Sequence, residues 1–123
     1  YKALGDLFYA VAAADHIVRA EEREQLDNEI QFAWKHYDNS TDRFGSDRAF
    51  LTEFEFEAME DNMTPAEEAY EAFEAYFSDH QQEIDTHTRI RIFNSARHIA
   101  EAIRKLNKEE TKYLVRLKHL LSV

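Results

Sequence analysis

Hydrophobic residues recur every three or four positions along most of the chain, which is the spacing of one face of an α-helix. This pattern predicts six helices, each with an apolar stripe that a bundle would bury. They are Ala3 to Asp15, Ala20 to Tyr37, Arg48 to Asp61, Pro65 to about Gln82, a fifth helix begun by Asp85 or Thr86, and a last helix begun by Asn107. The sequence therefore predicts an all-α fold, a compact bundle of about six helices.

The apolar stripes also name the residues that we expect in the core. They are Leu4, Leu7, Phe8, Val11 and Ala14 in the first helix, Leu26, Ile30, Ala33 and Tyr37 in the second, Ala66, Ala69, Tyr70, Phe73, Tyr76 and Phe77 in the fourth, Ile92, Ala96, Ile99, Ala100 and Ile103 in the fifth, and Leu114, Leu117, Leu120 and Leu121 in the last. The clearest helix start is at Thr64, which we expect to cap the fourth helix. Pro65 suits the first helical position, and Glu67 would complete a capping box.

The segment from Arg48 to Asp61 is apolar on two sides when it is drawn as a helix. One stripe holds Phe50, Leu51, Phe54 and Ala58, and the other holds Phe56, Met59 and Met63. A helix of this kind is buried between neighbours or contributes to an interface. We expect Phe56, Met59 and Met63 to form an interface, and a homodimer is one form that it could take.

The composition indicates one helical domain that spans residues 1–123. Two glycines and one proline leave little material for the tight turns of a sheet, and the length suffices for a single core. The chain has no cysteine, which excludes disulfides, thiolate metal sites and cysteine nucleophiles.

Acidic and basic residues are separated along the chain. No Lys or Arg lies between Arg48 and Arg89, whereas acidic residues fill that stretch and basic residues predominate after it. Either oppositely charged helices lie side by side in the fold, or a charged face remains for a partner or a cation. The separation of charge and the aromatic-rich middle helices lead us to expect a protein partner. The net charge of -10 argues against binding to nucleic acid or anionic membranes.

The longest apolar run, Leu7 to Ala14, is far shorter than the roughly 20 residues that a membrane-spanning helix needs. No signal-peptide pattern is visible. We expect a cytoplasmic protein that reaches a membrane only through its partners. The sequence begins with Tyr1 rather than Met, which leaves open whether residues precede it.

Two stretches near the ends of the chain resemble each other. When Ala20-Glu21-Glu22 is aligned with Lys108-Glu109-Glu110, Leu26 meets Leu114, and Ala12 and Ala14 meet Ala100 and Ala102. Each stretch reads as the junction of a helical hairpin. Such a repeat favours two hairpins related by a pseudo-twofold axis, although hairpins that share only their capping chemistry would look similar.

The first junction also resembles a known family. Ala13-Ala14-Asp15-His16-Ile17-Val18 followed by Glu21-Glu22-Arg23 is similar to the signature of the tellurite-resistance TerB-like domain, in which an Ala-Asp-Gly step precedes a Glu-rich helix start. The chain departs from it at His16, where the family usually has glycine, and at Arg19, where it often has Ser or Pro. The resemblance implies an all-helical, non-catalytic module linked to stress-response or envelope-associated assemblies. We expect it to require no cofactor.

The resemblance further implies divalent-cation binding at the acidic signature. The candidate ligands are Asp15 and Glu22, with Glu21 and His16 beside them. A full EF-hand is excluded, because Val11, Ala13 and His16 stand where that loop needs oxygen ligands and a glycine. The alternative is that Asp15, Glu21 and Glu22 serve the helix ends, by accepting backbone hydrogen bonds and complementing the helix dipole.

The chemical motifs of enzymes are weak in this sequence. It holds no Glu-x-x-His pair of the kind that di-iron bundles use, no glycine elbow around a serine and no phosphate-binding glycine loop. A carboxylate-dependent hydrolase would need a concave pocket that joins acids from different helices. We therefore expect a protein that is not an enzyme, with cation binding as the first alternative and a hydrolase as the second.

Overall fold

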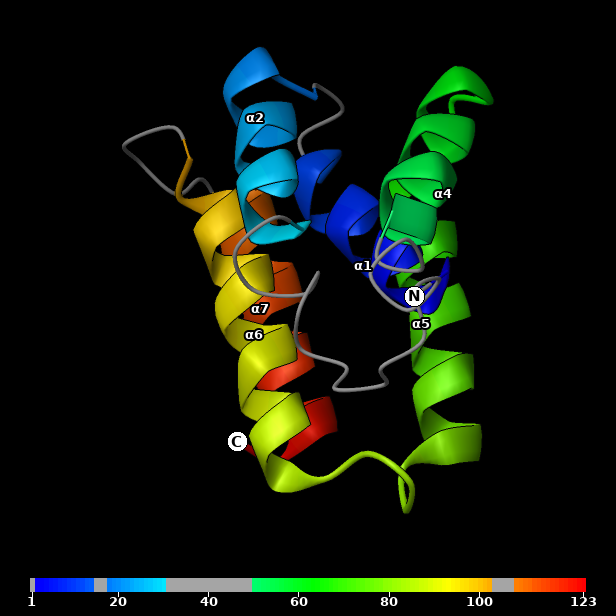
Figure 1. Ribbon diagram of the computed structural model, residues 1–123, viewed down its shortest axis with the longest axis vertical. Coiled ribbons are helices and arrows are strands. Elements are labelled where there is room, and N and C mark those ends of the chain that lie inside the picture. The colour runs from blue at the N-terminus through cyan, green and yellow to red at the C-terminus, as the bar shows by residue number, and fades with distance from the viewer. Residues whose placement is uncertain (1, 15–17, 31–49, 103–107) are drawn as a thin grey trace.

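The computed structural model describes residues 2–14, 18–30, 50–102 and 108–123, and in these ranges it contains six helices (Figure 1). They are α1 (Lys2–Ala12), α2 (Ala20–Glu29), α4 (Phe50–Asp61), α5 (Ala66–His80), α6 (Thr86–Ala100) and α7 (Lys108–Leu121). The predicted all-α bundle of about six helices is confirmed. In the same ranges, none of the helices combines the length and the apolar character needed to cross a membrane.

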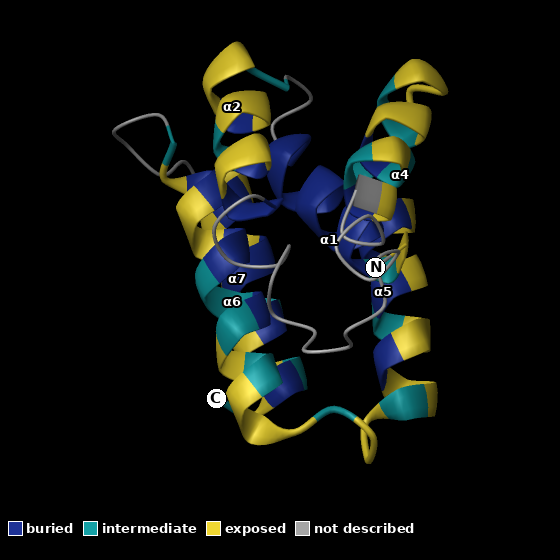
Figure 2. Cartoon of the chain, in the orientation of Figure 1, coloured by how far each residue is buried: buried dark blue, intermediate teal, exposed yellow. Residues whose placement is uncertain are grey.

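Helix α1 lies at the centre of the bundle and is buried on every side (Figure 2). It packs against α4, α5, α6 and α7. Leu7, Phe8 and Val11 have no exposed surface, and the small residues that follow, including Ala10 and Ala12, let the neighbouring helices approach closely. A helix that is apolar all round is stable only when other helices surround it.

The outer helices each contribute one apolar face to this core. Their fully or nearly buried residues are Leu26 in α2, Ala69, Tyr70, Phe73 and Phe77 in α5, Ile92, Ala96, Ile99 and Ala100 in α6, and Tyr113, Leu114, Leu117 and Leu121 in α7. These are mostly the residues that the helical spacing predicts. Tyr76 is an exception, because it is half exposed and stacks on His80 at a ring distance of 4.1 Å. The expected core residues Ala33, Tyr37 and Ile103 lie outside the described residues.

Helix α4 is turned differently from what its two apolar stripes suggest. Phe56 is 1% exposed and meets the ring of Tyr9 edge-on at 5.7 Å, so it is a core residue that offers no surface to a partner. Leu51 and Phe54 lie outside instead, with 48% and 64% of their surfaces exposed. The prediction that Phe56 belongs to an interface is therefore wrong. Burying Phe56 against α1 leaves Leu51 and Phe54 facing solvent.

The helix ends agree with the sequence at one site and differ at another. Asp85 caps α6, since its Oδ1 accepts a hydrogen bond from the Thr88 backbone N–H at 2.7 Å. Hydrogen bonds from the side chain and then the backbone of Thr88 lower the pKa of Asp85. The predicted cap at Thr64 is not formed. Pro65 holds the cap position of α5 without a side-chain bond, and the Thr64 carbonyl instead accepts the Tyr9 hydroxyl at 2.6 Å.

The two terminal hairpins have matching boundaries. Helix α1 ends at Ala12 and α6 at Ala100, while α2 begins at Ala20 and α7 at Lys108, which are the pairs that the sequence alignment joins. Burial matches as well: Glu22 and Glu110, each the third residue of its helix, are both completely buried. The internal similarity therefore extends from the sequence to the helix ends.

Helices α1 and α4 cross at Gly5, where there is no room for a side chain. A Cβ atom at Gly5 would lie 2.6 Å from the Thr52 carbonyl oxygen and 2.7 Å from the Glu55 Cβ. Beside this contact, the buried Asp6 carboxyl forms a hydrogen bond with Glu55. Burial, that bond and the nearby Glu55 charge together raise the pKa of Asp6 to about 8, so Asp6 is mostly protonated at neutral pH.

We predict that Gly5→Ala destabilises the protein by about 2 kcal/mol, because the two helices would have to separate to admit the methyl group. In an uncrowded helix the same substitution stabilises by up to about 1 kcal/mol. Urea unfolding followed by circular dichroism measures the sign. An unchanged or higher free energy of unfolding would contradict the close crossing of α1 and α4.

Candidate functional site

Of the acidic signature residues, the structure describes Glu21 and Glu22, and their surroundings differ. Glu22 is completely buried, whereas Glu21 in the same helical turn is exposed. Glu22 Oε1 accepts the Arg19 backbone N–H at 3.0 Å, and the Arg19 guanidinium lies 3.8 Å from the same oxygen. This geometry is that of a carboxylate that completes the start of α2. Asp15 and His16 lie outside the described residues.

Two of the four candidate cation ligands, Asp15 and His16, therefore lie outside the described residues. Within residues 2–14, 18–30, 50–102 and 108–123, no three His, Asp or Glu side chains are arranged so that they could hold a metal ion. Cation binding at Asp15 and Glu22 stays a prediction.

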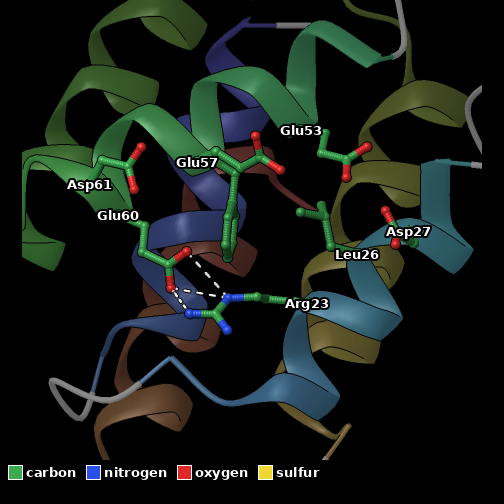
Figure 3. Close-up of a pocket in the computed structure, with 8 residues that line it drawn as sticks. Arg23, Leu26, Asp27, Glu53, Glu57, Glu60 and Asp61 are labelled. Atoms are coloured by element: carbon green, nitrogen blue, oxygen red, sulfur yellow. Dashed lines mark hydrogen bonds and ion pairs between the residues drawn. The ribbon is translucent and has the colours of Figure 1, made fainter.

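A groove of about 440 Å³ runs between α2 and α4 (Figure 3). The buried side chains of Leu26 and Phe56 form its floor, so the core lies directly beneath it. The walls are polar. They are lined by Arg23 and Asp27 from α2 and by Glu53, Glu57, Glu60 and Asp61 from α4. Residues three, four or seven positions apart share one side of a helix, which is why α4 directs this row of carboxylates into the groove.

An ion pair bridges one end of the groove. Arg23 Nε donates to both carboxylate oxygens of Glu60, at 3.2 and 3.1 Å, and Arg23 Nη2 also contacts Glu60 (Figure 3). The Arg23 side chain is largely exposed. Its hydrogen bonds to Glu60 raise the pKa of the Arg23 guanidinium above its usual value. One of the carboxylates that line the groove is thus balanced by the one basic side chain among the lining residues.

Two carboxyl groups meet at the other end. Glu53 and Asp27 face each other across the groove, and Glu57 lies one turn along α4 from Glu53 (Figure 3). Partial burial, followed by the nearby Asp27 carboxyl and the negative charge of Glu57, raises the pKa of Glu53 to about 7. Burial is the largest cause of this raised pKa, and the neighbouring carboxyls Asp27 and Glu57 add to it. A cation that entered the groove would relieve the repulsion between these carboxyls.

Exposed apolar residues accompany the acidic row on α4. Leu51 and Phe54 occupy the stripe next to the groove and are 48% and 64% exposed. Met63, which the sequence assigned to an interface, follows the end of α4 in a left-handed backbone conformation with φ 54° and is 85% exposed. Met59 is partly buried against the core. The accessible apolar surface around α4 is therefore made by Leu51, Phe54 and Met63.

The sequence pattern indicated only the α4 wall of this groove. The stretch without Lys or Arg indicated that α4 is acidic, and its apolar stripes indicated a surface with a function. Arg23 and Asp27 carried no motif, because their importance comes from facing α4 across the groove. Contacts between segments that are distant in the sequence leave no periodic signal within either segment.

Comparison with known proteins gives no relative: no family model matches the chain, and no curated protein or solved structure matches it.

We predict that Asp27→Asn lowers the pKa of Glu53 from about 7 towards its usual value of 4.5, because the substitution removes the nearest negative charge. The raised pKa means that the folded protein retains a proton that the unfolded chain loses, so this carboxyl reduces stability as the pH rises from about 4.5 to about 7. Carbon-detected NMR titration of the glutamate carboxyls measures the shift. Glu24→Gln, an exposed change elsewhere on α2, is the control and should leave Glu53 unchanged.

The cation hypothesis predicts saturable binding of Ca²⁺, Mg²⁺, Zn²⁺ or Mn²⁺ in isothermal titration calorimetry. Asp15→Asn and Glu22→Gln should each abolish it, since each removes a carboxylate ligand. Glu109→Gln, at an exposed position in the first turn of α7, is the matched control. The absence of heat with all four ions would exclude this role.

Proposed function

We propose that the protein is a non-enzymatic, TerB-like helical module that binds protein partners through α4 and the acidic groove beside it. The partner is a basic amphipathic helix, and the setting that the resemblance suggests is a stress-response or envelope-associated assembly. The observation that carries the proposal is the exposure of Leu51 and Phe54 directly beside a row of carboxylates.

The apolar part of this surface supports binding by a helix. Leu51, Phe54 and Ala58 recur at intervals of three and four residues, so they form one stripe along α4. The carboxylates of Glu53 and Glu57 form the next stripe. A partner helix that lay along α4 could bury its own apolar residues on the first stripe while its basic residues reached the second. Recognition of amphipathic helices by grooves follows this arrangement.

The charges favour a basic partner over an acidic or neutral one. Arg23 pairs with Glu60, and this leaves Asp27, Glu53, Glu57 and Asp61 to face the open groove. Lysine or arginine side chains placed there would form ion pairs and would favour the ionised form of Glu53. Such contacts chiefly determine which partner is accepted and how fast it associates.

A carboxylate-dependent hydrolase is the alternative, because the groove does join acids from two helices and Glu53 has a pKa of about 7. A shared proton between two carboxyls is a feature of aspartic proteases. Two observations favour the interaction module. Asp27 is exposed on the surface of α2, and exposed apolar residues on the same helix as Glu53 give a partner an area to cover.

We predict that the protein binds a fluorescein-labelled 18-residue helical peptide with lysines along one stripe and leucines along the next, a length of about 27 Å. Leu51→Ser with Phe54→Ser should weaken this binding about tenfold, because it removes the apolar contact. Glu57→Lys with Asp61→Lys should weaken it by a similar factor through charge repulsion. Fluorescence anisotropy measures both.

The matched control is Glu68→Lys with Glu71→Lys, which makes the same change of charge at exposed positions on α5. This variant should bind the peptide as the unmodified protein does. A peptide with glutamates in place of the lysines should not bind. Equal binding by the α4 and α5 variants would contradict the proposed surface.

A further inference from the structure

We propose that the partner helix is α7 of a second copy of this chain, so that copies associate head to tail through α7 of one and the α4 groove of the next. This inference rests on the proposed function of the groove. It adds the identity of one partner, because the exposed face of α7 is basic where the α4 groove is acidic.

The outward face of α7 is basic and carries an exposed apolar residue. Lys108, Lys112, Val115 and His119 follow one another at intervals of three or four residues, so they form one stripe. All four are exposed, and Val115 retains 52% of its surface. The opposite face of α7, which holds Leu114 and Leu117, is buried in the bundle. A helix with this division of residues has the amphipathic, basic outer surface that the groove would select.

The basic residues of α7 differ in the contacts that they make within the chain. Arg116, on the edge of the stripe, forms an ion pair with Glu67 of α5 at 2.6 Å and lies 4.2 Å from the Tyr70 ring. Among the described residues, Lys112 instead contacts the ring of Tyr113 in its own helix, at 5.6 Å. Lys108 and Lys112 are both exposed, so their charges are accessible to a second copy.

The two faces agree in length. The carboxylates from Glu53 to Asp61 span about 12 Å of α4, and the stripe from Lys108 to His119 spans about 16 Å of α7, at 1.5 Å per residue. Each face also combines charge with an apolar residue, which is Phe54 on α4 and Val115 on α7. Charged and apolar contacts can thus be matched along about two turns of the two helices.

The positions of the faces determine the kind of assembly. Helix α4 lies at one side of the bundle, and the α6–α7 pair lies at the other (Figure 1). A copy that seats its α7 in a neighbour's groove consequently leaves its own groove open for a third copy. Contacts of this heterologous type build chains, or rings where the rotation closes, rather than two-fold dimers.

The association should be weak and should depend on salt. One helix in one groove buries less than the roughly 1,200 Å² of a stable interface, so we expect a dissociation constant on the order of 100 µM. The net charge of -10 makes copies repel each other at long range. About 0.1 M salt screens that repulsion beyond about 10 Å while preserving contacts, and about 1 M salt screens the contacts as well.

Sedimentation equilibrium of the whole chain tests the inference. At about 0.1 M salt the average mass should rise beyond that of two chains as the protein approaches about 1 mM, and at about 1 M salt it should return to one chain. Glu57→Lys with Asp61→Lys, and separately Lys108→Ala with Lys112→Ala, should each weaken association about tenfold or more. The α5 variant Glu68→Lys with Glu71→Lys should associate like the unmodified chain.

Mixing the two variants distinguishes this arrangement from others. The α4 variant retains a native α7, and the α7 variant retains a native groove, so an equimolar mixture should form a complex of two chains that grows no further. A symmetric interface between like faces would not be restored by mixing. A mixture that stays monomeric, or association that neither variant weakens, overturns the inference.

The outcome also separates this inference from the proposed function. If the chain stays monomeric while the basic peptide binds the groove, then the partner is another protein and α7 is excluded. If neither binds, the groove is not an interaction surface and both proposals fail. If only the α4 variant loses self-association, α7 is excluded as the occupant while the α4 surface is retained.

Discussion

The burial of α1 on every side is the constraint on which the rest of the molecule depends. Leu7, Phe8, Ala10, Val11 and Ala12 have no exposed surface, so four other helices have to direct an apolar face towards α1. Burying a side chain of the size of Phe8 contributes about 2–3 kcal/mol. Close packing around α1 also leaves no room for a side chain at Gly5 and buries the Asp6 carboxyl. The packing that stabilises the fold is thus also the largest cause of the raised pKa of Asp6.

The groove is a consequence of the same arrangement. Helix α4 packs on α1, whereas α2 packs on α6, where Glu29 and His98 meet at 2.7 Å. The side chains of α2 and α4 then face each other across a gap with core residues at its floor. Because both walls are acidic, one arginine balances only part of the charge. Partial burial is the largest cause of the raised pKa of Glu53, and repulsion from Asp27 and Glu57 adds to it.

Carboxyl groups in this molecule serve three different purposes that residue type alone does not distinguish. Glu22 is buried and supports the start of a helix, Asp6 is buried and protonated at a helix crossing, and Glu53 lies in an open groove. Only Glu53 combines access to solvent, excess negative charge and neighbouring exposed apolar residues. That combination is why the α4 surface, and not the acidic signature, carries the proposals.

The sequence by itself determined the helical fold, the boundaries of most helices and the matching ends of the two hairpins, because these depend on periodicity, turn residues and charge within single segments. The tertiary structure decided which side of α4 is buried. Leu51 and Phe54 fit a helix stripe as well as Phe56 and Met59 do, and only packing against Tyr9 and the rest of α1 selects Phe56 for the core. It also decided that Arg23 and Asp27 face α4, since the groove exists only once α4 is packed on α1 and α2 on α6.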